Sequence, residues 1–397
     1  MRQQPHYRSP KLLIVYASYG DGHIQAAKAL QEAYSNLGHD KQQIVMYDLM
    51  AEAHPWINEM TRLFYQKSYT HLPYLYGWMY DITKPMKHDS LFGSWLHSFG
   101  KQKIRQILLA ENPDAVVYTF PLFAPQRLQQ RGSRIPSYVV MTDFDLHCRW
   151  VHPGIDRYYV ATSELQADLK RLGIHHNHIT VSGIPLKKGF QAGAQPNHTL
   201  FAKHGLQPGK PVVLIMGGAQ GVLPHITEMC ACLLRRSSDV QIALVCGRNH
   251  ELKAAIDAAY GHGSLQPRLR TFGYVNEMHE LMALADCLVT KPGGITLAEA
   301  IAAELPPFIY RPVPGQEKRN ALFLQSKGAA FVANDLDMLM DEMLDLLHDP
   351  LRLMNIRLNI RKLQPKGAPS TGTNTAAEAI ILDIVSNLRI INHATHL

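Results

Sequence analysis

The sequence predicts an α/β protein with two doubly wound parallel sheets, each in its own domain. Short, continuous apolar runs recur along the chain, and such runs are typical of parallel strands buried on both faces. Helical or turn-rich stretches separate them, as crossover connections between parallel strands require. A glycine-rich turn follows the first apolar run of each half, and 397 residues suffice for two domains of ordinary size.

The N-terminal domain is expected over residues 1–188. Its first strand, Leu12–Tyr16, leads through a glycine turn into a helical pattern that stops at Gly38. Further strands are expected at Ile44–Tyr47, Ala115–Tyr118, Tyr138–Met141 and Tyr158–Ala161. Strand, glycine turn and helix in this order form the first step of a doubly wound domain.

The pattern starts again in the second half, where residues 189–369 are expected to form a C-terminal domain. Its strands are expected at Val212–Met216, Ala243–Cys246, Cys287–Thr290 and Phe308–Tyr310. Residues 370–397 are expected to form a helix that packs back on the N-terminal domain. Apolar residues at helical spacing support this helix: Ala377, Ile380, Ile381, Ile384, Val385 and Leu388.

The amino-acid composition indicates a globular protein and argues against several other classes. With 46% hydrophobic and 18% charged residues the chain is globular, and no apolar run reaches the length of a membrane-spanning helix. The start is polar, without the apolar core of a signal peptide, so a cytoplasmic location is expected. The five cysteines are odd in number and contain no C-x-x-C pair, so we expect buried thiols rather than disulfides or a zinc ribbon.

Charge and aromatic residues are unevenly distributed. Residues 1–190 carry +6 of the net charge of +7, and residues 54–99 hold three of the four tryptophans. Tryptophan and tyrosine favour membrane interfaces, where flanking lysines such as Lys67, Lys84 and Lys87 meet anionic headgroups. The alternative is a helical insertion whose aromatic side chains form core, and the sequence leaves both interpretations open.

The segment Ala17–His23 lies where a strand ends and a helix begins. Its glycines, Gly22 among them, allow close approach, and the helix N-terminus offers free N–H groups to a polar ligand. His23 titrates near neutral pH, which suits a general base that takes a proton from an attacking hydroxyl. Its alternative role is to cap the helix.

Two aspartates follow the strand at Tyr138–Met141, at the edge where open α/β sheets bind ligands. Asp143 and Asp145 are candidate metal ligands, but two carboxylates are weak evidence, and a turn-capping role is expected for at least one of them.

The most specific pattern is Lys291–Ala300 followed by Pro312–Asn320, two polar loops that each come after a strand. Gly294 and Thr296 open a helix whose bare N–H groups are suited to a diphosphate. Glu299, one turn later, is placed to accept hydrogen bonds from ribose hydroxyls. Gln316 and Glu317 are candidates for holding a sugar.

Four motifs in this order resemble the family of monogalactosyldiacylglycerol synthases and processive diacylglycerol glucosyltransferases. They are ASYGDGHIQAA at Ala17–Ala27, TDFDLHCRW at Thr142–Trp150, the pair Gly217-Gly218 and the Lys291–Asn320 string. The resemblance runs from about Leu12 to about Ala377. It implies an inverting glycosyltransferase, similar to glycosyltransferase family 28, with two Rossmann-like domains facing a central cleft (GT-B type).

The resemblance also implies roles for individual residues. His23 would be the acceptor-side base, with Gly22 and Asp143 near the acceptor. The remaining assignments concern the donor: Gly218, Gly294 and Thr296 at the phosphates, Phe272 to Val275 at the uracil, Glu299 at the ribose, and Gln316 and Glu317 at the hexose.

The substrates implied are UDP-glucose or UDP-galactose as co-substrate and diacylglycerol as acceptor, at an anionic membrane surface. Neither a bound metal nor a nucleic-acid partner is expected. The protein would be cytoplasmic and peripherally associated with the cytoplasmic membrane. Three alternatives remain open: N-acetylglucosamine transfer to another lipid or cell-wall precursor, a non-catalytic nucleotide-sugar sensor, and a nucleotide-sugar epimerase.

Overall fold

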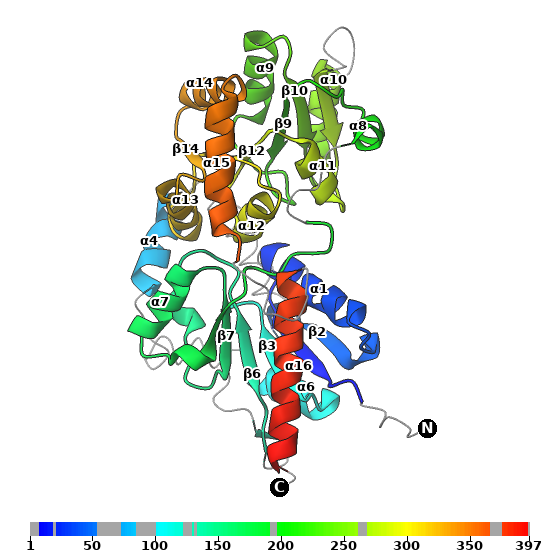
Figure 1. Cartoon of the computed structure of the whole chain (residues 1–397), viewed down its shortest axis with the longest axis vertical. Helices are drawn as coiled ribbons and strands as arrows, with labels where there is room; N and C mark the ends of the chain where they lie inside the picture. The colour runs from blue at the N-terminus through cyan, green and yellow to red at the C-terminus, as the bar shows by residue number, and fades with distance from the viewer. Residues whose placement is uncertain are drawn as a thin grey trace. The chain divides into compact units, whose positions relative to one another are not determined.

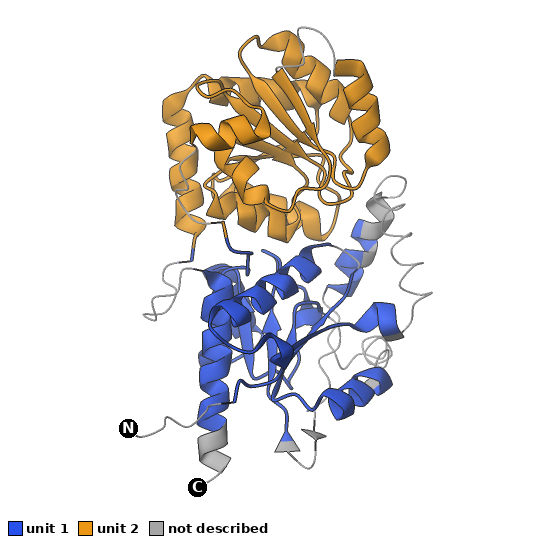
Figure 2. Ribbon diagram, turned by 90° about the vertical axis from the view of Figure 1, so that its right-hand side faces the viewer, with its two compact units in different colours: residues 1–188, 365–397 blue, residues 189–364 orange. Residues whose placement is uncertain are grey.

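The computed structural model describes residues 8–18, 21–53, 73–84, 101–121, 129–130, 133–190, 197–260, 268–365 and 375–395. The chain divides into two compact units, residues 1–188 with 365–397 and residues 189–364 (Figure 2). In the described ranges each unit contains a six-stranded parallel sheet with flanking helices (Figure 1). The predicted α/β fold with two doubly wound sheets is confirmed.

The sheet of the first unit has the strand order β2-β1-β3-β6-β7-β8. The strands are β1 (Leu12–Tyr16), β2 (Ile44–Asp48), β3 (Ala115–Tyr118), β6 (Ser137–Val140), β7 (Arg157–Val160) and β8 (Ile179–Val181). β1 lies between β2 and β3, with Leu12 paired to Ile44 on one side and Ala115 on the other. A short antiparallel pair, β4 (Gln129–Gln130) and β5 (Ser133–Arg134), lies outside this sheet.

The helices of the first unit are α1 (Asp21–Asn36), α2 (Leu49–Ala53), α4 (Pro73–Thr83), α6 (Lys101–Glu111), α7 (Ser163–Arg171) and α16 (Ala376–Thr395). Short 3₁₀ turns lie at η1 (Lys41–Gln43), η2 (Cys148–Trp150) and η3 (His176–His178). α1 buries small alanines and Leu30, which lets the helix approach the sheet closely.

The C-terminal helix α16 completes the core of the first unit. It packs against α1, and its buried isoleucines join the cluster formed by α1 and the sheet (Figure 1). Asp383 anchors the helix, because its carboxylate accepts hydrogen bonds from the Arg157 guanidinium at 2.6 Å and the buried Tyr159 hydroxyl at 2.7 Å. The same carboxylate raises the pKa of Arg157 against the opposing effect of burial.

The sheet of the second unit has the strand order β11-β10-β9-β12-β13-β14. The strands are β9 (Val212–Met216), β10 (Gln241–Val245), β11 (Leu269–Phe272), β12 (Cys287–Thr290), β13 (Pro307–Tyr310) and β14 (Phe331–Ala333). The helices are α8 (His198–His204), α9 (Ile226–Arg236), α10 (His250–Tyr260), α11 (Met278–Leu284), α12 (Gly294–Ala302), α13 (Gln316–Ser326), α14 (Leu336–Leu347) and α15 (Pro350–Leu363).

Every strand expected from the sequence is present, with ends displaced by at most two residues. Five strands within the described residues were missed. β4 and β5 are two residues each and form their own pair, while β8, β11 and β14 each lie at the edge of a six-stranded sheet. An edge strand has only one neighbour and is less buried, so it lacks the continuous apolar run of a central strand.

One thiol also departs from expectation, since Cys148 is half-buried whereas the other four cysteines are buried.

No helix within the described residues is long and apolar enough to span a bilayer.

We expect Ile381→Ala to lower the free energy of unfolding of the first unit by about 2–5 kcal/mol, because Ile381 is 0% exposed in the shared core of α1 and α16. Ile390→Ala is the matched control on the same helix, since Ile390 is 67% exposed, and we expect a change below about 0.5 kcal/mol. Urea unfolding followed by tryptophan fluorescence reports this unit selectively, because all four tryptophans precede residue 189. Equal effects of the two substitutions would contradict a packed α16.

Candidate functional site

Three neighbouring strands of the first unit end around His23. β1 leads toward α1, whose third residue is His23, while Thr119 and Phe120 follow β3 and Thr142 lies two residues after β6. Since parallel strands end at the same edge of a sheet, these groups from distant parts of the sequence come together. The sequence motifs identified His23 and the loop at Thr142 but not Thr119. The same rule about strand ends would have found it.

The His23 ring is held through one of its two nitrogens. Nδ1 lies 2.8 Å from the Thr119 carbonyl oxygen and 3.0 Å from the Thr142 hydroxyl. A carbonyl oxygen only accepts hydrogen bonds, so Nδ1 carries the proton and Nε2 presents a lone pair. The Thr119 hydroxyl in turn donates to the His23 carbonyl at 3.1 Å, which fixes the strand end to the helix.

The surroundings of the His23 ring keep it neutral. Phe120 meets it edge-on with ring centroids 4.7 Å apart, and the Trp150 ring lies 6.4 Å away. Burial lowers the pKa of His23 from 6.5 to about 4, although the hydrogen bond to the Thr119 carbonyl opposes the shift. At neutral pH the imidazole is therefore unprotonated and able to accept a proton at Nε2.

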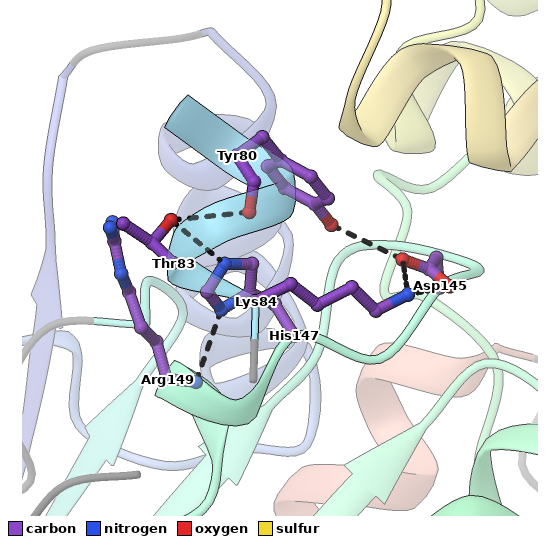
Figure 3. A network of polar contacts seen from close by, with 6 residues as sticks. All are labelled: Tyr80, Thr83, Lys84, Asp145, His147 and Arg149. Carbon is purple, nitrogen blue, oxygen red and sulfur yellow. Dashed lines mark hydrogen bonds and ion pairs between the residues drawn. The ribbon is translucent and has the colours of Figure 1, made fainter. Parts of the chain in front are cut away.

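The two aspartates after β6 differ in their environment. Asp143 is buried at 6% exposure in the loop that also carries Thr142. Asp145 accepts hydrogen bonds from Lys84 Nζ at 2.7 and 2.8 Å and from the Tyr80 hydroxyl at 3.2 Å (Figure 3). The interpretation of Lys84 as a residue that faces lipid headgroups is therefore corrected, because its ammonium pairs with Asp145 instead.

This pairing belongs to a polar network that fastens α4 to the loop after β6. The Thr83 hydroxyl lies 3.5 Å from His147 Nε2, and His147 Nδ1 accepts from the Arg149 backbone N–H at 3.2 Å (Figure 3). On α4, Trp78 is 62% exposed and Ile82, one turn later, is 41% exposed. The rest of the predicted aromatic segment, residues 54–72 and 85–99 with Lys67 and Lys87, lies outside the described residues.

In the second unit, the turns after β9 and β10 interlock. Gly218 and Gly247 both have positive φ, and the Arg248 N–H donates to the Ala219 carbonyl at 2.9 Å. A Cβ on Gly247 would lie 2.4 Å from the Ala219 carbonyl oxygen, closer than any side chain allows. Glycine is therefore required here for the backbones to meet.

The loop after β12 leads directly into α12. Gly293 is the N-cap of that helix, without a side-chain cap, and Gly294 is its first residue. Thr296 and Glu299 follow on half-buried positions of the same helix. The first N–H groups of a helix have no partner within it, so this end attracts anions.

The loop after β13 reaches the same part of the second unit. It ends at Gly315, and α13 begins with Gln316 and Glu317. The buried Asn320 side chain donates to the Pro292 carbonyl at 3.2 Å, so it ties α13 to the loop after β12. Glu317 Oε1 lies 3.9 Å from Lys291 Nζ. The structure thus brings Gly218, Gly294, Glu317 and Lys291 together, although the sequence analysis assigned no role to Lys291.

The segment from Phe272 to Val275, expected near the uracil, has side chains that pack into the fold. Phe272 and Val275 pack partly against the core of the second unit, so their side chains support the fold. The Phe272 carbonyl accepts a hydrogen bond from the Cys246 N–H at 2.8 Å. Tyr274 is 40% exposed, and the Arg248 guanidinium lies over its ring at 4.8 Å, a stacked pair that sequence reasoning missed.

The chain is similar to known glycosyltransferases over nearly its whole length. Residues 23–186 match the family described as monogalactosyldiacylglycerol (MGDG) synthase, and residues 212–365 match the glycosyltransferase family 28 C-terminal domain. Two similar curated proteins are named processive diacylglycerol beta-glucosyltransferase. The one from Bacillus licheniformis is 36% identical, with 96% of each chain covered, and the one from Bacillus pumilus is 38% identical, with 91% of this chain and 93% of the relative covered.

A solved structure supports the fold alone. The glycosyltransferase SnogD from Streptomyces nogalater matches with a TM-score of 0.59 and 15% identity, over 96% of this chain and all of that one.

The pKa of His23 predicts the acid side of the pH profile. We expect kcat/KM for sugar transfer to stay flat from pH 8 to about pH 5 and to fall only near pH 4, since the ring stays neutral above its lowered pKa. With an ordinary histidine pKa of about 6.5, kcat/KM would instead fall about tenfold by pH 5.5. Initial rates measured across this range, with circular dichroism at each pH to confirm folding, distinguish the two. A midpoint near pH 6.5 would contradict the lowered pKa of the His23 ring.

Proposed function

The chain belongs to the monogalactosyldiacylglycerol synthase family of glycosyltransferases, and from this premise we propose that it transfers a hexose from a UDP-sugar to the hydroxyl of diacylglycerol. Glucose is the first sugar to consider, because the similar curated proteins are named for it, and galactose is the second. Family 28 enzymes invert the anomeric configuration, so the product is a β-glycosyldiacylglycerol.

The observation that carries this proposal is the state of His23. Its Nδ1 proton is committed to the Thr119 carbonyl, and Nε2 presents a lone pair. In the proposed step, Nε2 takes the proton of the acceptor hydroxyl while the hydroxyl oxygen bonds to the anomeric carbon. The bond from that carbon to the diphosphate breaks, and its electron pair leaves with UDP. Two further residues are assigned to the acceptor side. Gly22 directly precedes His23 in the sequence, and Asp143 lies on the loop after β6.

The donor is assigned to the second unit. Gly218, Gly294 and Thr296 are placed at the diphosphate, where a bare turn and a helix N-terminus oppose the negative charge that grows as UDP leaves. Glu299 is assigned to the ribose, and Gln316 with Glu317 to the hexose. The backbone from Phe272 to Val275 is assigned to the uracil.

A membrane-facing role for α4 follows from how it is fastened. Tyr80 and Lys84 hold one side of the helix to Asp145, while Trp78 and Ile82 are exposed. An exposed tryptophan one turn from an exposed isoleucine suits a membrane interface, where the ring is apolar and its N–H stays hydrated. We assign α4 to contact with the cytoplasmic membrane, which would place the protein there peripherally.

The function is tested with purified protein and liposomes that contain diacylglycerol. We expect UDP-glucose or UDP-galactose to yield β-glycosyldiacylglycerol, identified by mass spectrometry and by the anomeric proton coupling in NMR. His23→Ala should reduce the rate by about 10²–10⁴-fold without weakening UDP binding, because it removes the general base and leaves the second unit intact. A product formed only from UDP-N-acetylglucosamine, or a variant that keeps more than about a tenth of the activity, would contradict the assignment.

The role of α4 is tested by sedimentation with anionic liposomes. We expect the double variant Trp78→Ser, Ile82→Ser to lose most of its liposome binding, because both apolar side chains are exposed for contact with lipid. Leu109→Ser is the matched control, since Leu109 on α6 is 74% exposed in the same unit. An unchanged melting temperature would confirm that α4 is not core. Equal loss in the control, or undiminished binding by the double variant, would place the membrane contact elsewhere.

A further inference from the structure

Lys291 lies in the proposed donor site. It follows β12 and precedes α12 by three residues, and its side chain lies beside Gly218 in the turn after β9. A Cβ built on Gly218 would lie 2.9 Å from Lys291 Cε and 3.8 Å from Nζ. The ammonium is therefore held against the one side of the Gly218 backbone that glycine leaves bare.

An acidic group that faces this ammonium is Glu317, in the first turn of α13. Its side chain is 9% exposed, and that of Lys291 is 22% exposed, so both charges are largely withdrawn from water. The 3.9 Å between Nζ and Oε1 exceeds a hydrogen bond, so this contact is an electrostatic attraction without a shared proton. Asn320 holds α13 against the loop after β12, which fixes the distance between the two charges.

The charges around this pair favour an anion. The ammonium of Lys291 and the N-terminus of α12 at Gly294 are both electropositive, and Glu317 contributes a negative charge against them. A diphosphate carries more negative charge than one carboxylate and presents several acceptor oxygens. It therefore competes with Glu317 for the Lys291 ammonium.

We propose that Lys291 binds the donor diphosphate and that Glu317 is its resting partner until the donor arrives. When the ammonium turns to the diphosphate, the Glu317 carboxylate is released to accept hydrogen bonds from the hexose hydroxyls. Binding of the phosphates thereby prepares the sugar site in the same loop pair. This inference rests on the proposed function, because it takes a nucleoside diphosphate sugar as the ligand of the second unit.

The test compares the affinities of uridine, UMP, UDP and UDP-glucose, measured by isothermal titration calorimetry. We expect Lys291→Met to weaken UDP binding by about 10- to 100-fold, as the loss of a hydrogen bond to a charged group predicts, and to change uridine binding less than twofold. Lys291→Arg should restore most of the UDP affinity because it keeps the charge. If Lys291 had a purely structural role, Lys291→Met would weaken the binding of uridine and of UDP equally.

Two further variants complete the design. Glu317→Gln should bind UDP at least as tightly as the native protein, because it removes the competing charge, while the extra affinity contributed by the glucose moiety falls. Lys318→Met is the matched control, since Lys318 is exposed at the next position of α13 and its removal should leave all four affinities within twofold.

The outcomes separate the two proposals. If the native protein binds UDP and Lys291→Met binds it equally well, the role of Lys291 is wrong and the proposed function stands. If Glu317→Gln weakens UDP as much as Lys291→Met does, the pair is structural and the exchange is wrong. If the native protein binds none of the four ligands, the donor assignment and the inference fall together.

Discussion

Parallel pairing of the strands within each sheet determines where the functional loops of both units lie. Because every strand of a parallel sheet ends at the same edge, loops separated by long stretches of sequence meet there. In the first unit this brings Thr119, after β3, within 2.8 Å of the His23 ring nitrogen, 96 positions away in sequence. In the second unit the same geometry gathers the loops after β9, β12 and β13 around Lys291.

The two candidate centres differ in how they treat charge. Around His23, aromatic rings and burial disfavour the protonated imidazole, so the group remains a base at neutral pH. In the second unit, the N-terminus of α12 begins three residues after Lys291, and a helix N-terminus beside an ammonium favours an anion. This difference agrees with the proposed roles, a proton acceptor in the first unit and a phosphate site in the second.

Two helices of the first unit, α4 and α16, are held in place by ion pairs between residues that are far apart in the sequence. Asp145 forms an ion pair with Lys84, which joins α4 to the loop after β6. Asp383 on α16 forms an ion pair with Arg157 and accepts a hydrogen bond from the Tyr159 hydroxyl, which joins α16 to the sheet. In both cases an ion pair joins a helix to the rest of the unit, and for α16 the apolar contacts contribute most of the stability. For α16 those contacts are buried isoleucines, whereas α4 leaves Trp78 exposed.

The central strands and the glycine turns that follow them could be predicted from the amino-acid pattern alone. β1, β3, β9 and β12 match their predicted bounds residue for residue, because strands buried on both faces need an uninterrupted apolar run. The edge strands β8, β11 and β14 escaped prediction because a partly exposed strand needs no such run. Three features became visible only in the folded chain: the groups that face His23, the pairing of Lys84 with Asp145, and the position of Lys291 beside Gly218 and Glu317. These contacts join loops that the sheet brings together, and no local sequence pattern records a distance between separate loops.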